Sequence, residues 1–491
     1  MSGACEFSDL SNTPSRQPEK PLPIGRARSN CDKSATSSSR ASDLLAAGLE
    51  ALDFLNLGVV VTDESRAVLL ANRTAEQILI ERDGIELSAE GVLTDTRGAC
   101  NPPLGSIIRH VAGAHRSTAC TTSSCVLAIR RGSGRRQLTL VVRPVDESSS
   151  SIQKDKRVLV FLLDPERPTL TTEDGLRNLF ELTASEAKLA TFLMSGQRLE
   201  DCCDHLDIRA STARMHLGNI FAKTRVQRQG QLVALLLKSV GMISGSQEND
   251  LEKMLSHRPT RRQYRKPTSA VQPDINSTLT AGLEALNLVN VGVIVINHGR
   301  RILFTNHTVQ QILATQDGLA ITSDFTLAAT TKSCRAQLSA ALDRATSDGS
   351  NGSSLSKSTT VAVKRPSGKR PLTLLVRALV NSSSQISTNC PAVVLFLLDP
   401  ERPIAPDDDG LRQLYGFTNT EARLAYLLME GNTVQECCAQ LRIRPSTARM
   451  HLGNLFAKTG VQGQGQLISL LLKSVGILRV KSDSTVVDKL S

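Results

Sequence analysis

The feature that most constrains this chain is an internal repeat. Residues 211–219 recur without a change as residues 446–454, and the stretch 164–168 recurs as 399–403. Because the matches keep the same order and spacing, the chain carries one multi-part unit twice. The unchanged stretch suggests a surface that both copies need for the same job.

The 491 residues are too many for a single hydrophobic core, and each copy divides into an α+β part and a helical part. Residues 1–40 are rich in Ser, Pro and Arg with few apolar residues to bury, which is typical of disorder. The expected segments are a disordered N-terminal segment at 1–40, α/β domain 1 at 41–168, helical domain 1 at 175–243, a basic flexible linker at 244–276, α/β domain 2 at 277–403, helical domain 2 at 410–478 and a tail at 479–491.

Short strands and helices alternate in α/β domain 1. We expect order to begin near Ser42, which can cap a helix that runs to Leu57. Gly132 and Gly134 lie between two apolar runs and indicate a hairpin. Strands are expected at 58–63, 67–72, 125–130, 137–144 and 158–164, and helices after 72 to about 80 and at 104–114. This order predicts an α+β domain on an antiparallel sheet.

Residues 58–63 and 69–72, with Ala75 in the next helix, resemble the opening of a PAS sensory domain. The resemblance implies a sensing or dimerisation module and leaves its small-molecule ligand unknown. A haem-binding PAS domain needs a ligand such as His110, but the counterpart in the second copy is Arg344. No flavin-adduct cysteine motif is visible, so no cofactor is expected and any cofactor-binding residues are unknown.

Helix signals follow one another in helical domain 1. Thr183 caps a helix with Glu186 three residues on, which makes a capping box, and Gly196 ends that helix. Further helices are expected at 199–205, 210–224 and 229–240, with a turn at 206–209. Two helices around a tight turn, the second one basic, are typical of a helix-turn-helix.

Over about 179–240 the chain is similar to the LuxR-type DNA-binding domain. The match rests on Leu182, Thr183, Glu186, Gly196, Leu206, Ile208, Thr212, Ala213, Arg214, His216, Ile220, Phe221 and Lys223. It implies a four-helix domain that binds double-stranded DNA, usually as a dimer on paired half-sites, with the fourth helix helping to pair. We name the helix at 210–224, and its copy at 445–459, the candidate recognition helices.

The candidate recognition helix has two contrasting faces. Ala213, Leu217 and Ile220 follow helical spacing and form one buried stripe. The opposite face carries cations and small residues, and neither 208–246 nor 441–482 contains Asp or Glu. Such a face fits a major groove lined by phosphates. The alternative interpretation is a solvated basic face on a structural helix.

The LuxR resemblance also implies roles for single residues. Arg214 and Met215 point into the groove, where an Arg can bond a guanine edge for about 1–3 kcal/mol of discrimination. Lys223 contacts phosphate, and Thr212 contacts the DNA backbone near the helix start. The full candidate DNA-binding set is Thr212, Arg214, Met215, Gly218, Asn219, Lys223, Arg228, Thr447, Arg449, Met450, Gly453, Asn454 and Lys458.

Gly218 and Gly453 depart from the family, which often has a groove-facing basic or polar residue there. A glycine inside a helix costs about 1 kcal/mol relative to alanine. Its presence in both copies suggests either a close approach of backbone or a weaker contact. The residue before each candidate recognition helix, Arg209 or Arg444, stands where a capping serine is usual. The base sequence that is read therefore stays open.

The amino-acid composition restricts the kinds of partner that this chain is expected to bind. The net charge of +11 favours an anionic partner, and the absence of Trp argues against a stacking platform for single strands. No run has the length of a transmembrane helix, so we expect a cytoplasmic protein with no membrane partner. The pairs Cys202–Cys203 and Cys437–Cys438 lack zinc-ligand spacing and are expected to pack in the core, with no metal.

We therefore predict an α+β PAS-like domain followed by an all-α LuxR-type helix-turn-helix domain, twice in one chain, acting as a transcription regulator. A flexible linker of about 33 residues spans about 30 Å, comparable to the roughly 34–36 Å between half-sites one turn apart. One chain could thus act as its own pseudo-dimer, and self-association through the PAS-like domains and last helices is also expected. The basic run at 258–266 tracks phosphates or stays solvated.

Two other classes of function stay open on the sequence. A signalling or sequestration protein could pair with other LuxR-type regulators without binding DNA, although the cations of the candidate recognition helices speak against it. An enzyme is not expected, because no phosphate-cradling glycine loop and no catalytic cluster stands out.

The two helical domains should differ in how tightly they hold DNA. Helical domain 1 has Arg225 and Arg228 where helical domain 2 has Gly460 and Gly463, and additional contacts to phosphates steepen the loss of affinity with salt. We predict that helical domain 1 binds more tightly and has the steeper salt slope, measured on each isolated domain by fluorescence anisotropy. Equal affinity and equal slope would contradict this prediction.

Overall fold

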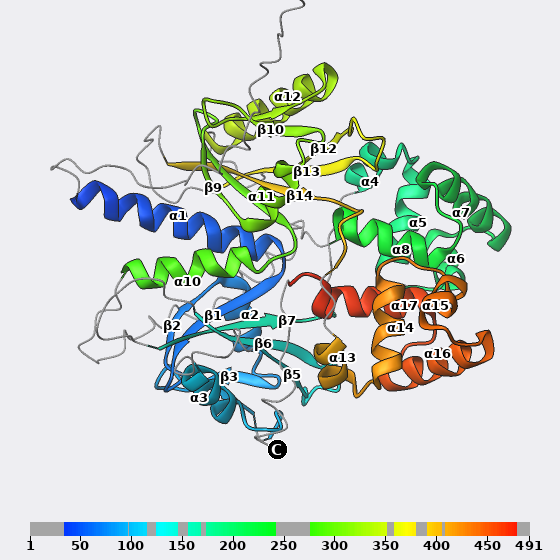
Figure 1. Cartoon of the computed structure of the whole chain (residues 1–491), viewed down its shortest axis with the longest axis horizontal. Coiled ribbons are helices and arrows are strands. Elements are labelled where there is room, and N and C mark those ends of the chain that lie inside the picture. The colour runs from blue at the N-terminus through cyan, green and yellow to red at the C-terminus, as the bar shows by residue number, and fades with distance from the viewer. Residues whose placement is uncertain are drawn as a thin grey trace, which may run out of the picture.

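The computed structural model describes residues 34–96, 98–114, 124–145, 156–167, 173–241, 275–350, 358–379, 390–404 and 408–478. Figure 1 shows the two α/β domains on one side of the molecule and the two helical domains next to each other on the other side. The duplicated sequence therefore folds into two layers, and each layer contains one part from each copy.

α/β domain 1 is built on a five-stranded sheet. Its elements are α1 (Ser34–Phe54), β1 (Leu57–Asp63), β2 (Val68–Ala71), α2 (Arg73–Glu81), β3 (Ile85–Leu87), β4 (Leu93–Asp95), α3 (Leu104–Ala114), β5 (Cys125–Ile129), β6 (Leu138–Pro144) and β7 (Arg157–Leu163). The strand order is β2-β1-β7-β6-β5, with antiparallel neighbours throughout. The predicted antiparallel α+β domain is confirmed.

α/β domain 2 repeats this arrangement. Its elements are α10 (Ile275–Asn287), β8 (Gly292–Asn297), β9 (Ile302–Thr305), α11 (His307–Ala314), β10 (Leu319–Ile321), β11 (Leu327–Ala329), α12 (Lys332–Ser350), β12 (Thr359–Val363), β13 (Leu372–Ala378) and β14 (Pro391–Leu398). The order β12-β13-β14-β8-β9 is the first sheet read from its other edge.

Asn72 fixes the start of α2 against β1. Its side-chain oxygen accepts hydrogen bonds from the Val59 amide at 2.8 Å and the Ala75 amide at 3.1 Å. Its own amide group donates to the Leu57 carbonyl at 2.8 Å. Asn306 caps α11 and accepts a bond from β8 in the same way. The repeated asparagine is therefore a structural residue, since it satisfies buried backbone groups at a strand–helix junction.

The helical domains are also equivalent. Helical domain 1 contains α4 (Glu173–Phe180), α5 (Ala184–Met194), α6 (Leu199–Leu206), α7 (Ala210–Thr224), α8 (Gln229–Leu236) and the π-helical turn η1 (Leu237–Gly241). Helical domain 2 contains α13 (Asp408–Tyr415), α14 (Asn419–Met429), α15 (Val434–Leu441), α16 (Pro445–Thr459), α17 (Gln464–Leu471) and the turn η2 (Leu472–Gly476). The predicted capping box of Thr183 and Glu186 is present.

Several sequence expectations about boundaries are corrected. Helix α1 begins at Ser34, so 34–40 is helical, and Ser42 lies inside the helix, because no Gly or Pro interrupts the stretch. The helix ends at Phe54, not Leu57, and Asn56 follows with a left-handed φ of 53°. Each helical domain has one more helix than expected, α4 or α13, and α8 ends at Leu236 in a π-helical turn.

The expected linker is also shorter, since α10 starts at Ile275. The segment 1–33, the basic run at 258–266 and the tail at 479–491 lie outside the described residues. In the part of the chain that is described, no helix is both long enough and apolar enough to cross a membrane.

The two copies bury each other's apolar faces. One hydrophobic cluster joins both α/β domains, and in it α1 packs along α10. A second cluster joins both helical domains, and in it α8 packs along α17. Moreover, α4 packs on β12 and α13 packs on β5. Each helical domain thus also lies against the α/β domain of the other copy, as Figure 1 shows for α4 beside β12 and β13.

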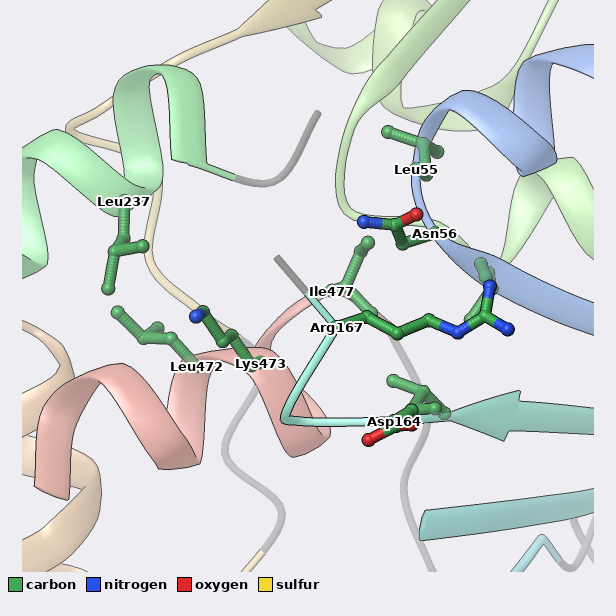
Figure 2. Close-up of a pocket in the computed structure, with 10 residues that line it drawn as sticks. Leu55, Asn56, Asp164, Arg167, Leu237, Leu472, Lys473 and Ile477 are labelled. Carbon is green, nitrogen blue, oxygen red and sulfur yellow. The ribbon is translucent and has the colours of Figure 1, made fainter. Parts of the chain in front are cut away.

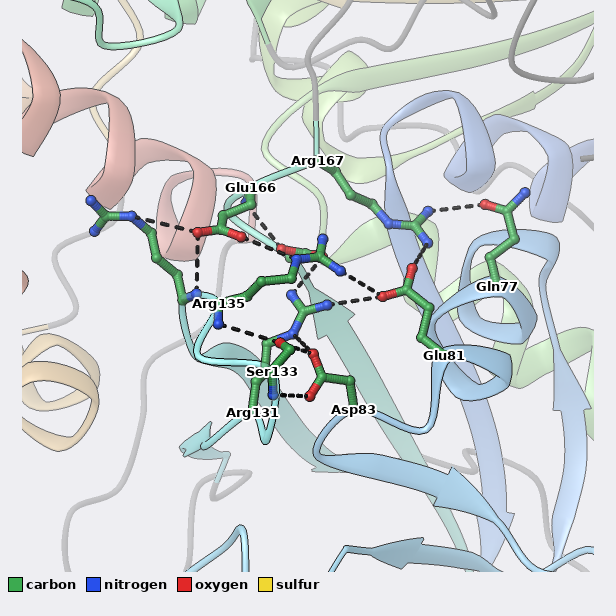
Figure 3. Close-up of polar contacts among 10 residues, drawn as sticks. Gln77, Glu81, Asp83, Arg131, Ser133, Arg135, Glu166 and Arg167 are labelled. Atoms are coloured by element: carbon green, nitrogen blue, oxygen red, sulfur yellow. Dashed lines mark hydrogen bonds and ion pairs between the residues drawn. The ribbon is translucent and has the colours of Figure 1, made fainter. Parts of the chain in front are cut away.

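Arg131 ties the β5–β6 hairpin to the end of β7 through buried ion pairs. Its guanidinium, 1% exposed, lies 2.8 Å from the carboxylates of Asp83 and Asp164 and 2.9 Å from that of Glu81. Figure 3 shows these side chains converging on one cluster. Burial acts to raise the pKa of Asp83, but hydrogen bonds from Ser133 and Arg131 outweigh it and lower the pKa to about 2. Asp83 therefore stays ionised at neutral pH.

We predict that Arg131 is essential for stability. Arg131→Met leaves Asp83 without its ion pair and leaves Asp164 with the longer contact to Arg135 at 3.3 Å. Removing one partner of a buried ion pair costs about 3–5 kcal/mol. Arg365 is its counterpart, and its ion pairs among the described residues are with Asp317 at 2.7 Å and Asp399 at 2.9 Å, so Arg365→Met should cost less. The measurement is the urea midpoint of the full chain. Arg82→Met, which removes a side chain that is 73% exposed, is the control, and equal midpoints for it and Arg131→Met would refute the prediction.

Candidate nucleic-acid interface

The candidate recognition helices α7 and α16 turn equivalent faces to solvent. Arg214 and Arg449 are exposed, and Met215 and Met450 are each 55% exposed. In the predicted stripe, Ala213 and Ile220 are buried on the opposite side and Leu217 is half-buried. Figure 1 shows both helices at the outer edge of the helical layer. The face thus offers guanidinium donors for base edges and a methionine for apolar contact with a thymine methyl group.

Gly218 and Gly453 lie on this exposed face. Apart from the chain neighbours and the helix's own backbone, no described atom lies within 4 Å of a Cβ built on either residue. Nothing inside the described molecule therefore requires glycine there, although alanine would favour the helix by about 1 kcal/mol. Both interpretations left open by the sequence, a close approach of backbone and a weaker contact, agree with this exposed position.

Lys223 and Lys458 are each held by a carboxylate of their own domain. The Lys223 ammonium lies 2.7 Å from the Glu186 carboxylate, and the Lys458 ammonium lies 2.7 Å from that of Glu421. Both glutamates are only 2% exposed and also cap the helix that they begin. These lysines therefore fasten α7 to α5 and α16 to α14, and a DNA phosphate has to compete with the carboxylate for each ammonium.

Some of the other candidate residues are exposed, and some make contacts inside the molecule. Thr212 and Thr447 are half-buried in the first turn of their helices, and Asn219 is exposed on α7. Asn454 is exposed too, but it donates a hydrogen bond to Glu421. Arg228 is exposed at the start of α8. The Thr433 backbone is the first cause of the lowered pKa of Glu436, and the charge of Arg228 adds to it. Arg228 therefore lies near helical domain 2.

The C-terminal end of each candidate recognition helix is held by the α/β domain of the other copy. Arg370 donates to the Thr224 carbonyl at 2.9 Å and the Arg225 carbonyl at 3.3 Å. Arg136 donates to the Thr459 carbonyl at 2.9 Å. A cation at this end satisfies carbonyls that lack a helical partner and interacts favourably with the helix dipole. The sequence analysis missed both arginines, for which the only signal was a basic pair after each hairpin glycine.

The paired cysteines behave as core residues. Cys202 and Cys437 are fully buried, and Cys438 is 8% exposed. Burial raises the pKa of Cys202 to about 11 and that of Cys437 to about 12, so both thiols stay protonated at neutral pH. The prediction of core packing is confirmed for Cys202, Cys437 and Cys438, whereas Cys203 is half-buried. Among the described residues, no group of three His, Cys, Asp or Glu side chains is placed to hold a metal ion.

Sequence comparison gives one partial relative. No protein-family model matches the chain. The monoamine regulon transcriptional regulator of Klebsiella aerogenes is 35% identical over 94 residues, which is 19% of this chain. The chain spans only 40% of the length of that regulator. The similarity is therefore to a part of a transcriptional regulator.

Solved structures give only weak likenesses. The VqmA–ligand–DNA complex of Vibrio cholerae has a TM-score of 0.18 and 14% identity, covering 40% of this chain and 89% of that chain. The phage VqmA–DPO complex has the same TM-score of 0.18 with 11% identity and the same coverage, 40% and 89%. The E. coli DhaR(N)–DhaL complex has a TM-score of 0.15 and 12% identity over 74% of this chain and 89% of that chain. Likenesses at this level decide nothing about function, which rests on the residues of this chain.

Glu421 links the stability of helical domain 2 to acid pH. Burial acts to raise its pKa, but hydrogen bonds from Lys458, the Thr418 backbone and Asn454 outweigh it and lower the pKa from 4.5 to about 2. A carboxyl group with a lower pKa in the folded chain adds stability above its unfolded pKa and loses that contribution as the pH falls through its folded pKa. The relevant window is therefore from pH 4.5 down to about 2.

We predict that Lys458→Met lowers the urea midpoint at pH 7 and that this difference shrinks as the pH falls from 4.5 toward 2, because protonated Glu421 no longer attracts the ammonium. The measurement is a series of urea titrations of the full chain at several pH values. Lys188→Met removes an exposed lysine of α5 and should change neither the midpoint nor its pH dependence. A Lys458→Met difference that is constant over the window would count against this account.

Proposed function

We propose that this chain is a sequence-specific DNA-binding transcription regulator with two helix-turn-helix domains in one polypeptide. The observation that carries the proposal is the pair of identical, carboxylate-free faces on α7 and α16. Arg214 and Arg449 read base edges, Met215 and Met450 contact bases or thymine methyl groups, and the two glycines admit the DNA backbone. A solvated structural face needs neither an exposed methionine nor a glycine at equivalent positions of both copies.

The packing of α8 against α17 supports a single-chain pseudo-dimer. Polar contacts accompany this packing. Ser469 donates a hydrogen bond to the Met194 carbonyl at 2.8 Å, and Arg198 donates one to Gln462. Two recognition helices joined through such a pair of helices resemble a dimeric helix-turn-helix protein on two half-sites. The chain between the two copies then only has to connect them, while the packed helices set their spacing.

The α/β domains take the PAS-like sensing role in this proposal. Each one lies against the helical domain of the other copy and donates an arginine to the end of a recognition helix. A change in either α/β domain would therefore act on the position of a recognition helix. The similarity of 94 residues to a transcriptional regulator of Klebsiella aerogenes supports regulation of transcription as the class of function.

The test is footprinting of genomic fragments by the full chain and by an Arg214→Ala/Arg449→Ala variant at several salt concentrations. One bidentate contact to a base is worth about 1–3 kcal/mol, so the double variant should lose its specific footprints. Arg82→Ala/Arg109→Ala removes two exposed arginines of α/β domain 1 and gives a control of the same net charge. It should keep every footprint.

Each single variant tests whether both copies bind. Arg214→Ala alone should erase one half of a two-part footprint, and Arg449→Ala should erase the other half. If all variants bind weakly, equally and only at low salt, sequence reading is refuted. That outcome would instead favour a protein that sequesters other LuxR-type regulators without binding DNA.

A further inference from the structure

Two equivalent cavities lie where the α/β domains meet the last turns of the helical domains. The first cavity, of about 470 Å³, lies between the ends of β1 and β7 and the turns η1 and η2. Figure 2 shows Lys473 and Leu472 on the side of the helical domains and Asp164 and Arg167 on the side of α/β domain 1. The second cavity, of about 350 Å³, lies at the corresponding place in α/β domain 2 and contains Lys238.

The lysines of the two cavities differ in their partners. Lys238 lies 2.9 Å from the carboxylate of Glu430, which follows α14 in the other helical domain. The first copy has Ser195 at the position of Glu430. Among the residues that the structure describes, Lys473 has neither an ion pair nor a hydrogen bond. Burial lowers the pKa of Lys473, as expected for a cation with no compensating charge.

The other charges beside the first cavity are balanced. Arg167 lies 3.9 Å from the Glu81 carboxylate, and Asp164 lies 2.8 Å from the Arg131 guanidinium. The cluster in Figure 3 contains four carboxylates and four guanidinium groups, namely those of Glu81, Asp83, Asp164, Glu166, Arg131, Arg135, Arg136 and Arg167. Lys473 therefore adds one positive charge that the cluster does not neutralise.

We propose that the first cavity binds a small monocarboxylate with an apolar body, with the carboxylate against Lys473. A single unbalanced ammonium matches one negative charge, whereas a phosphate dianion would bring a second charge without a partner. Six of the ten lining residues are Leu or Ile, and these favour an aliphatic or aromatic body over a polar one.

The position of the site gives its occupant a role in coupling the layers. The lining residues come from α/β domain 1 and from both helical domains, so a bound molecule contacts both layers at once. An effect of the occupant on DNA binding rests on the proposed function. Binding itself does not, and it is therefore measured on the full chain without DNA, so that its failure and the failure of the proposed function are distinguishable.

Hexanoate is the probe, with hexanamide as its neutral analogue, and binding is measured by isothermal titration calorimetry. We expect one hexanoate site per chain and binding of hexanamide that is weaker by about tenfold or more, because charge-assisted bonds are the stronger ones. Lys473→Met should abolish hexanoate binding. Lys238→Met, which removes the lysine that Glu430 already neutralises, is the matched control and should leave it unchanged.

A pair of exchange variants tests the charge argument independently of Lys473 itself. Ser195→Glu places in the first copy the carboxylate that Glu430 provides in the second, and it should abolish hexanoate binding. Glu430→Ser frees Lys238 and should create a second site. Circular dichroism checks the fold of each variant. The proposal is overturned if hexanamide binds as tightly as hexanoate, if Lys473→Met or Ser195→Glu binds hexanoate normally, or if Glu430→Ser gains no site.

Discussion

The arrangement of this molecule depends on apolar helix faces that neither copy can bury alone. Leu52 and Leu286 on α1 and α10, and Leu236 and Leu471 on α8 and α17, have no accessible surface. Each belongs to a cluster shared by the two copies. Full burial of one such side chain is worth about 1.5–3 kcal/mol, so a layer of them holds the copies together. The relative position of α7 and α16 follows from this packing, because each helix is anchored in the shared helical core.

Ion pairs and hydrogen bonds of arginines add specific polar contacts to this apolar packing. Arg131 fixes the β5–β6 hairpin to the end of β7, and Arg136 on the same hairpin reaches the last turn of α16. Arg365 and Arg370 make the same connection from α/β domain 2 to α7. A continuous polar path therefore runs from the exit of each sheet to the opposite candidate recognition helix. The apolar core determines which domains are in contact, and the arginines determine which atoms form the polar contacts between those domains.

Local structure was predictable because it depends on local signals. The helix Ala210–Thr224, the capping box at Thr183 and most strands of α/β domain 1 follow from periodicity, capping residues and turn glycines. The crossed packing of α4 on β12 did not follow, since contacts between distant segments leave no periodic signal. The role of Lys223 was likewise hidden, because an exposed lysine and one paired with a buried Glu186 look alike in sequence. The same limit applied to Arg136 and Arg370.

The positions at which the two copies are identical and the positions at which they differ indicate which requirements act on each part of the unit. The stretch that is identical in both copies includes the exposed residues of α7 and α16. Apart from their own helix backbone and chain neighbours, no described atom lies within 4 Å of a Cβ built on Gly218 or Gly453. Internal packing therefore cannot account for the identity at these positions. By contrast, the copies differ at the equivalent positions Ser195 and Glu430, and Glu430 pairs with Lys238 of the other copy. The duplicated unit thus keeps this exposed face and varies the charge beside the two lysines. That combination suits a protein whose two copies share one kind of target and respond to different internal occupants.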